Sequence, residues 1–343
     1  MKTAIVLFNL GGPDSPEAVR PFLTNLFSDP AIIGLPGPLR WAVARLIAGR
    51  RAPLAREIYA KIGGASPIVP ETEAQAAALD AALAGRGLEA KSFLAMRYWT
   101  PFSDQTAAEI RAWGAQRVVL LPLYPQFSTT TMASSLAEWR RAARAAGLAL
   151  PEARICCYPW QPGFIAAEAR LVREALAKRK PGLPYRLLFS AHGLPKRVVE
   201  RGDPYQWQVE RTAAAIAEAL GISGLDWGIC YQSRVGPMEW IGPATDAEIR
   251  RAGAEGRSLI VVPIAFVSEH SETLVELDIE YSRLAQQSGV PDYLRVPTAG
   301  TAPEFIAGLA DLVMAALGGN KTVTCGNGRI CPAAQGRCGY EGA

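Results

Sequence analysis

Short apolar runs alternate with longer helical segments along most of the 343-residue chain. Four runs rich in β-branched and aliphatic residues predict buried strands, at residues 3–9, 117–123, 185–190 and 258–266. Segments rich in Ala, Glu and Arg predict helices at residues 71–85, 104–114, 133–146, 164–179, 205–220 and 302–317. Strands that alternate with helices form parallel sheets covered by helices, so the sequence predicts an α/β fold.

The pattern divides into two similar halves. Each half opens with an apolar strand and a Gly/Pro turn, NLGGP in the first half and SAHGLP in the second. We expect two Rossmann-like lobes, residues 1–155 and 156–317, each with a parallel sheet flanked by helices, and an active-site cleft between them. The tail, residues 318–343, is rich in Gly, Asn and Cys. It cannot build a core of its own, so we expect it to pack on the body of the protein.

Composition excludes several classes of protein. The net charge of +4 is too small to indicate a nucleic-acid binder. The start of the chain lacks the features of a secretory signal, and no apolar run approaches the ~20 residues of a membrane-spanning helix. No P-loop or dinucleotide fingerprint is present, so we expect no nucleotide cofactor. We therefore expect a cytoplasmic protein, whose six cysteines are ligands or core residues rather than disulfides.

A basic, apolar segment at residues 34–53 stands outside the alternation. It combines a tryptophan and several leucines with four arginines, Arg40, Arg45, Arg50 and Arg51. This combination is typical of a helix that lies in a membrane surface. An ordinary surface helix that packs on its own domain explains the pattern equally well.

The two histidines of the chain each follow a predicted strand. His192 lies in SAHGLP and His270 lies in VSEHSETL. Open α/β sheets place their chemistry at the carboxyl ends of the strands, so this placement predicts a site that handles protons or a metal. If a helix begins near Glu272, then Glu272, Glu276 and Glu280 share one face. That face is either solvated or an acidic track for cations or protons.

Eight motifs together resemble the ferrochelatases, which insert ferrous iron into a porphyrin in the final step of haem biosynthesis. The motifs, in chain order, are LGGP at 10–13, GGASP at 63–67, MRYWTP at 96–101, YPQFSTTT at 124–131, SAHGLP at 190–195, RGDPY at 201–205, QSRVGPMEWIGP at 232–243 and PIAFVSEHSETLVELDIEY at 263–281. The resemblance covers nearly the whole chain. It implies two Rossmann-like lobes and a reaction that forms protohaem from protoporphyrin IX and releases two protons. A coproporphyrin substrate, or another divalent metal, is the alternative.

The resemblance also implies roles for individual residues. His192 would accept a pyrrole proton, and Glu272, paired with His270, would relay protons or guide metal. The substrate iron would meet His192 and Glu272, with Glu276 continuing the acidic track. The macrocycle would be lined by Leu10, Arg97, Tyr98, Trp240 and Phe266, and the ring propionates would meet Arg50, Arg51 and Arg97. Residues 34–53 would form an apolar lip that contacts the membrane surface at the periphery of the inner membrane face.

Three tail cysteines, Cys325, Cys331 and Cys338, suggest a metal centre. Some ferrochelatases hold a [2Fe–2S] cluster with three such cysteines and one from the body of the chain, and the resemblance implies Cys157, or its neighbour Cys156, as the fourth ligand. A zinc ion held by four thiolates is the competing interpretation. Cys230 lies in a strand-like run and is expected in the core. The sequence leaves monomer and homodimer open.

Overall fold

A computed structural model describes residues 1–341 of the chain except 235, 237, 320 and 327. The chain divides into two compact units. Unit 1 comprises Met1–Cys157, Ala310–Arg329 and Gly339–Ala343, and unit 2 comprises Tyr158–Leu309 and Ile330–Cys338.

Unit 1 is built on a parallel sheet with the strand order β2-β1-β3-β4-β9. The strands are β1 (Thr3–Asn9), β2 (Ala90–Met96), β3 (Arg117–Pro122), β4 (Glu152–Cys157) and β9 (Thr322–Thr324). All seven residues of β1 are buried, because helices cover both faces of the sheet at its centre. A fully buried strand has no polar face, which is why β1 reads as a continuous apolar run.

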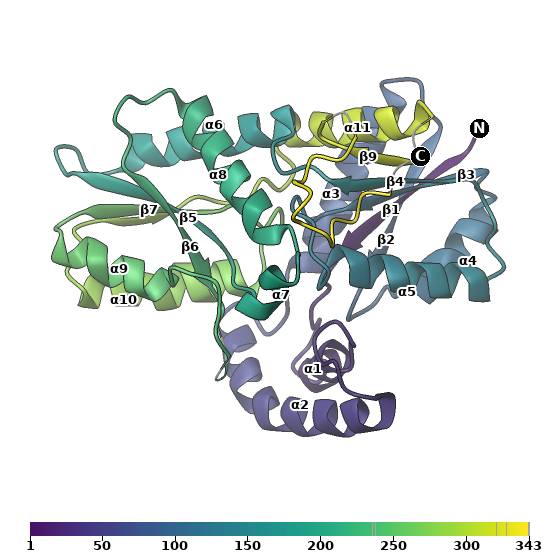
Figure 1. Cartoon of the computed structure of the whole chain (residues 1–343), viewed down its shortest axis with the longest axis horizontal. Coiled ribbons are helices and arrows are strands. Elements are labelled where there is room, and N and C mark those ends of the chain that lie inside the picture. The colour runs from purple at the N-terminus through teal and green to yellow at the C-terminus, as the bar shows by residue number, and fades with distance from the viewer. Residues whose placement is uncertain (235, 237, 320, 327, 342–343) are drawn as a thin grey trace. The chain divides into compact units, whose positions relative to one another are not determined.

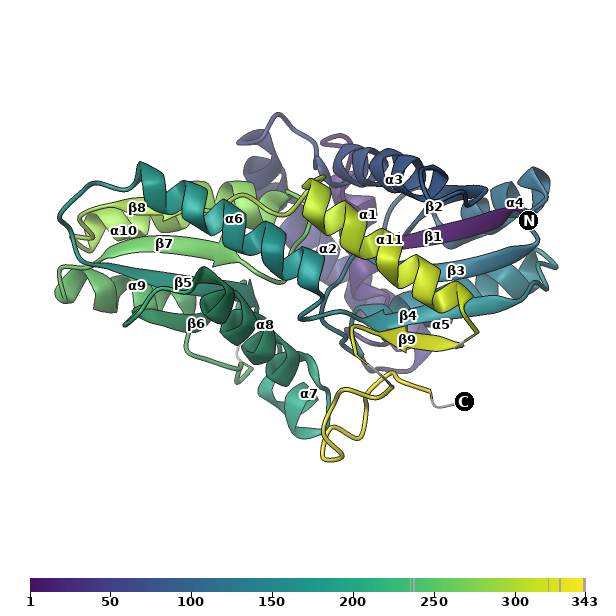
Figure 2. The same ribbon diagram turned by 90° about the horizontal axis from the view of Figure 1, so that it is seen from above.

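The helices of unit 1 are α1 (Val19–Phe27), α2 (Gly37–Ala60), α3 (Ile68–Ala84), α4 (Ser103–Trp113) and α5 (Met132–Ala145). Figures 1 and 2 show α3 on one face of the sheet and α4 and α5 on the other. This division follows from the strand order: the chain passes from β1 to β2 in one direction and from β2 to β3 in the other, and each crossover is right-handed.

Unit 2 repeats this plan with the strand order β6-β5-β7-β8, again parallel throughout. Its strands are β5 (Tyr185–His192), β6 (Trp227–Gln232), β7 (Ser258–Pro263) and β8 (Tyr293–Arg295). Its helices are α6 (Pro162–Lys178), α7 (Lys196–Glu200), α8 (Tyr205–Leu220), α9 (Thr245–Ala254), the π-helix η1 (Glu272–Tyr281) and α10 (Ser282–Gln287). Helices α6 and α8 lie on one face of the sheet, and α9 and α10 on the other (Figures 1 and 2). Helix α11 (Pro303–Leu317) begins in unit 2 and ends in unit 1.

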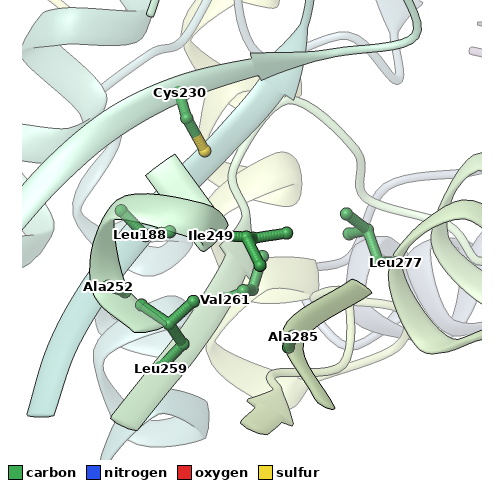
Figure 3. Close-up of a cluster of buried hydrophobic side chains, with 8 residues drawn as sticks. All are labelled: Leu188, Cys230, Ile249, Ala252, Leu259, Val261, Leu277 and Ala285. Carbon is green, nitrogen blue, oxygen red and sulfur yellow. The ribbon is translucent and has the colours of Figure 1, made fainter. Parts of the chain in front are cut away.

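A cluster of eight buried side chains forms the core between the sheet of unit 2 and α9, α10 and η1 (Figure 3). Its members are Leu188, Cys230, Ile249, Ala252, Leu259, Val261, Leu277 and Ala285. Each large aliphatic side chain contributes roughly 1.5–3 kcal/mol through burial. Cys230 is a core residue, as its place in a strand-like run predicted.

The predicted α/β fold with parallel sheets flanked by helices is confirmed. The four strongest strand signals correspond to β1, β3, β5 and β7, and the six predicted helices correspond to α3, α4, α5, α6, α8 and α11. The structure differs from the expected domains at the carboxyl-terminal end of the chain. There, α11 is shared between the units, and the tail contributes β9 to the sheet of unit 1 and residues 330–338 to unit 2.

Candidate functional site

The strand register of unit 2 brings the candidate residues to one edge of its sheet. His192, the last residue of β5, is paired with Gln232, the last residue of β6. Ser233 follows the last residue of β6 directly. His270 lies in the segment after β7, two residues before the π-helix η1 begins at Glu272. The carboxyl ends of parallel strands meet at one edge, so the two histidines predicted from sequence do belong to one group of side chains.

His192 and Glu272 form the central contact of this group. The Nδ1 atom of His192 lies 2.7 Å from Oε2 of Glu272, and the hydroxyl of Ser233 donates to the same carboxylate oxygen at 3.1 Å. The side chains of His192 and Glu272 keep 37% and 27% of their surfaces exposed, so both can be reached from outside the unit. The hydroxyl of Tyr205 donates to the backbone carbonyl of His192 at 3.0 Å and holds the end of β5 in place.

Opposite charges set the protonation of this pair. Burial alone would raise the pKa of Glu272, but the charge and hydrogen bond of His192, with smaller contributions from His270 and Ser233, lower the pKa to about 2. Burial would lower the pKa of His192, but the charges of Glu272 and Glu276 and the hydrogen bond that His192 donates to Glu272 raise it. The pair therefore favours an imidazolium beside a carboxylate.

Ser233 joins Glu272 to a second carboxylate. Its backbone N–H donates to Oε1 of Glu276 at 2.8 Å, and its hydroxyl approaches Oε2 of Glu276 at 2.5 Å. Gln232 donates to the same oxygen at 3.1 Å and to the carbonyl of Glu272 at 3.0 Å. Ser233 has a φ of 60°, in the left-handed region that non-glycine residues seldom adopt. The sequence analysis did not select these two residues, although both follow directly from the end of β6.

The helix that begins at Glu272 is a π-helix, in which hydrogen bonds join residues five apart. Glu272 and Glu276 still lie on one side of it, because the hydroxyl of Ser233 contacts both carboxylates. Tyr281, five residues after Glu276, donates its hydroxyl to that carboxylate at 3.0 Å. Asp278 pairs with Arg295 instead, at 2.5 Å. Burial and the charge of Glu272 raise the pKa of Glu276, so the two site carboxylates differ in proton affinity.

His270 occupies a different environment from His192. Only 6% of its surface is exposed, and its ring lies 4.5 Å from the ring of Phe266 between centroids. Its Nε2 atom lies 4.0 Å from Oε2 of Glu272, and its Nδ1 atom has no hydrogen-bond partner within the described part of the chain. Burial lowers the pKa of His270 more than the charges of Glu272 and Glu269 raise it, so a neutral imidazole is favoured. The family resemblance implied the proton acceptor at His192, whose pKa is instead raised.

The residues expected to line a macrocycle are divided between the units. Phe266 and Trp240 belong to unit 2, where Trp240 pairs with Pro195 in an isolated β-bridge. Both are partly exposed. Leu10 belongs to unit 1 and is also partly exposed.

Tyr98 and Arg97 are engaged inside unit 1, which departs from their expected roles. Tyr98 is 1% exposed, packs in the core cluster of α1 and α2, and donates its hydroxyl to Asp29 at 2.7 Å. Arg97 pairs with the same carboxylate at 2.8 Å and donates from Nε to Ser134 at 2.7 Å. Its guanidinium is therefore already neutralised by a buried anion, which does not favour propionate binding.

Helix α2 presents apolar side chains to solvent. Six of the eleven exposed large apolar residues within the described ranges fall between Ile32 and Leu54. Arg50 and Arg51 are also exposed. No helix in the described part of the chain is long and apolar enough to cross a membrane.

The cysteines do not assemble into a metal centre here. Cys157 and Cys325 belong to unit 1, whereas Cys331 and Cys338 belong to unit 2. Among the residues with described positions, no three His, Cys, Asp or Glu side chains are grouped so that they could hold a metal ion. The four ligands of one cluster would therefore have to come from both units.

The fold and the site together define an α/β protein with a hydrogen-bonded His–Glu pair at the strand ends of its second sheet. A solved structure described as SirB from Bacillus subtilis with Fe3+ has a similar fold, with a TM-score of 0.52, 12% identity, and coverage of 99% of this chain and 100% of that one.

Comparison of sequences shows a closer relationship than comparison of structures. The ferrochelatase family model matches residues 2–317. Ferrochelatases of Phenylobacterium zucineum and Hyphomonas neptunium are 56% and 51% identical to this chain, covering 98% of it and 98% and 94% of their own lengths. The chain belongs to the ferrochelatase family.

Proposed function

We propose that the protein inserts ferrous iron into protoporphyrin IX, which forms protohaem and releases two protons. The observation that carries this proposal is the contact between His192 and Glu272, which provides a proton-handling pair at an accessible strand edge. Membership of the ferrochelatase family supplies the reaction.

The reaction requires a group that removes protons from the ring. Two pyrrole N–H protons must leave as the metal enters the ring plane, and an imidazole within hydrogen-bond reach can accept one. In our proposal His192 is this acceptor once it has passed its own proton to solvent. The neutral imidazole of His270, beside Glu272, takes part in the same relay.

The second carboxylate suits the approach of the metal. The hydroxyl of Ser233 contacts the carboxylates of Glu276 and Glu272, and the carboxylate of Glu272 contacts the imidazole of His192. These oxygen and nitrogen atoms form a series of possible metal ligands. A series of partly neutralised ligands can pass on a substrate ion, whereas a closed ligand set would hold it. We propose that ferrous iron reaches the ring along these side chains.

Partly exposed apolar side chains are proposed to contact the macrocycle: Leu10, Trp240 and Phe266. Their rings and aliphatic groups suit a large flat ligand. A site that holds the macrocycle bent resembles the transition state for metal entry and speeds it. Arg50 and Arg51 are exposed cations that could meet the propionates.

Helix α2 is proposed to rest on a membrane surface from the cytoplasmic side. Leu39, Trp41 and Leu46 are 52%, 56% and 54% exposed, and Arg45 lies 4.8 Å from the ring of Trp41. Apolar side chains interleaved with cations suit an anionic lipid interface. The triple variant Leu39→Ser, Trp41→Ser, Leu46→Ser should cosediment several-fold less with anionic vesicles than the wild type, and equal sedimentation would contradict the proposal.

The tail cysteines are proposed to bind a [2Fe–2S] cluster with Cys157 or Cys156, a proposal that rests on the cysteine pattern alone. Its role would be to hold the tail. About two irons and two acid-labile sulfides per chain in anaerobically purified protein would support it. A colourless protein that contains zinc would overturn it.

The experiment that tests the main proposal is an anaerobic assay of the purified protein with ferrous iron. Protoporphyrin IX and coproporphyrin are compared as substrates, and cobalt and zinc are compared with iron. We expect the highest kcat/KM with ferrous iron and protoporphyrin IX. Preference for coproporphyrin would establish the alternative substrate, and the absence of any metal insertion would overturn the proposal.

A further inference from the structure

A hollow of about 750 Å³ opens on the surface of unit 2 between α6 and α8. Two indole rings contribute to its lining, those of Trp160 and Trp207, which meet edge to face with centroids 5.8 Å apart. Four alanines, Ala166, Ala214, Ala215 and Ala219, occupy positions around it. The hollow exists because bulky rings stand beside positions that carry only a methyl group.

One cation in the lining lacks a carboxylate partner. Arg211 lies on α8 with its guanidinium 5.9 Å from the ring of Trp207, and no ion pair joins it to a carboxylate among the residues that have described positions. Glu218 also contributes to the lining, but it lies seven residues further along α8, about 10 Å away along the helix axis. The end of the hollow near Trp207 therefore carries the positive charge of Arg211.

We propose that this hollow is a second binding site, for a small molecule with a flat aromatic ring system and one acidic group. The rings of Trp160 and Trp207 would contact the aromatic face, and Arg211 would bind the acid. The volume lies within the roughly 300–1,000 Å³ of small-molecule sites, which combine mostly apolar and aromatic linings with a few polar groups. None of the lining residues belongs to the His192–Glu272 group, so the site is separate from the proposed reaction.

Two fluorescent probes of similar shape test this site. One is 1-anilinonaphthalene-8-sulfonate, which carries an acidic group, and the other is N-phenyl-1-naphthylamine, which carries none. Ala215→Leu fills the hollow, so we expect this variant to bind one sulfonate probe fewer than the wild type. Arg211→Gln removes the charge and should weaken binding of the sulfonate probe there about tenfold, with no change for the neutral probe.

Matched substitutions on α9 control for charge and apolar surface. Ala247→Leu and Arg250→Gln alter exposed positions of the same unit and should bind both probes as the wild type does. Arg211 is exposed, so Arg211→Gln should keep the fold, which thermal unfolding checks, and it remains informative if Ala215→Leu unfolds. Wild-type binding of both probes by folded Arg211→Gln would overturn the proposal, as would an unchanged number of probe sites in folded Ala215→Leu.

Discussion

The imidazole of His192 and the carboxylate of Glu272 are 80 positions apart in the chain, and their Nδ1 and Oε2 atoms lie 2.7 Å apart. The contact joins the end of β5 to the first residue of the π-helix η1. Burial disfavours the charge on each partner, and the opposite charge of the other more than offsets it. Each partner therefore sets the proton affinity of the other.

His192→Ala should abolish iron insertion while porphyrin binding survives. Loss of a positioned proton acceptor lowers kcat by about 10²–10⁴-fold, because a pyrrole proton must then leave to solvent. Turnover is measured anaerobically, and porphyrin binding is measured by fluorescence titration. Lys196→Ala, at an exposed position just beyond β5, is the matched control and should react normally. Wild-type turnover by His192→Ala would contradict the proposed role of His192 as proton acceptor.

Two substitutions of Ser233 separate the effect of its backbone conformation from the effect of its hydroxyl group. Ser233→Ala and Ser233→Gly both remove the hydroxyl bonds to Glu272 and Glu276 and keep the backbone bond to Glu276, so both should weaken metal use, seen as a higher KM for iron. Only glycine tolerates the φ of 60° freely, so Ser233→Gly should be the more stable variant by about 0.5–1 kcal/mol. Thermal unfolding measures this difference. Greater stability of the alanine variant would contradict the strain argument.

Glu168 should make stability fall as pH rises. Its side chain is fully buried on α6, and burial, together with the charge of Glu269, raises its pKa well above 4.5. Between the unfolded and folded pKa values the unfolded chain binds fewer protons, so each pH unit costs stability, and each unit of pKa elevation amounts to about 1.4 kcal/mol. Glutamine does not ionise, so Glu168→Gln removes this loss of stability with rising pH. Its melting temperature relative to wild type should therefore increase from pH 5 to pH 8.

A carboxylate with the opposite shift provides the control for Glu168. Glu304 has a lowered pKa, because a hydrogen bond from its own backbone and a hydrogen bond from Arg170 stabilise its ionised form. Glu304→Gln should therefore lose stability relative to wild type as pH rises from the lowered folded pKa towards 4.5, and the difference should stay constant from pH 5 to pH 8, although exposure keeps the effect small. A difference between Glu168→Gln and wild type that does not change with pH would show that Glu168 is ionised in the folded protein.

The strand ends were predictable from sequence because a buried parallel strand is apolar on both faces and its boundary with a polar loop is sharp. His192 and Glu272 were found for this reason. The π-helix was not predictable, since the choice between four- and five-residue hydrogen bonding depends on tertiary contacts such as that of Ser233 with Glu276. Arg97 was expected to line the macrocycle from the family resemblance. Its pairing with Asp29 was not predictable, because Asp29 lies in a segment whose pattern predicted no element.

Substitution of Asp29, a buried residue of unit 1, should strongly lower the stability of the protein. Its side chain is 1% exposed and accepts from Arg97 and from the hydroxyl of Tyr98. Asp29→Asn leaves the largely buried guanidinium of Arg97 without its anion and should destabilise the protein by about 3 kcal/mol. Chemical denaturation measures the change. Asp104→Asn, which breaks an exposed pair with Arg141, should cost less than about 1 kcal/mol, and equal effects would refute the distinction.

Gly339 should be required for the tail to pack on unit 1. A Cβ atom at this position would lie 2.1 Å from the ring of Phe127, so glycine is the only residue that fits without movement. The same segment is held by Arg154, which donates to the carbonyl of Gly339 at 3.0 Å and pairs with Glu341 at 3.1 Å. Gly339→Ala should displace these contacts and speed proteolytic cleavage of the tail several-fold. Gly336→Ala, where the added Cβ meets nothing within 4 Å, should be cleaved at the wild-type rate, and Phe127→Leu should partly restore the protection of Gly339→Ala. Wild-type protection of Gly339→Ala alone would show that the ring of Phe127 yields and that the tail is held by Arg154.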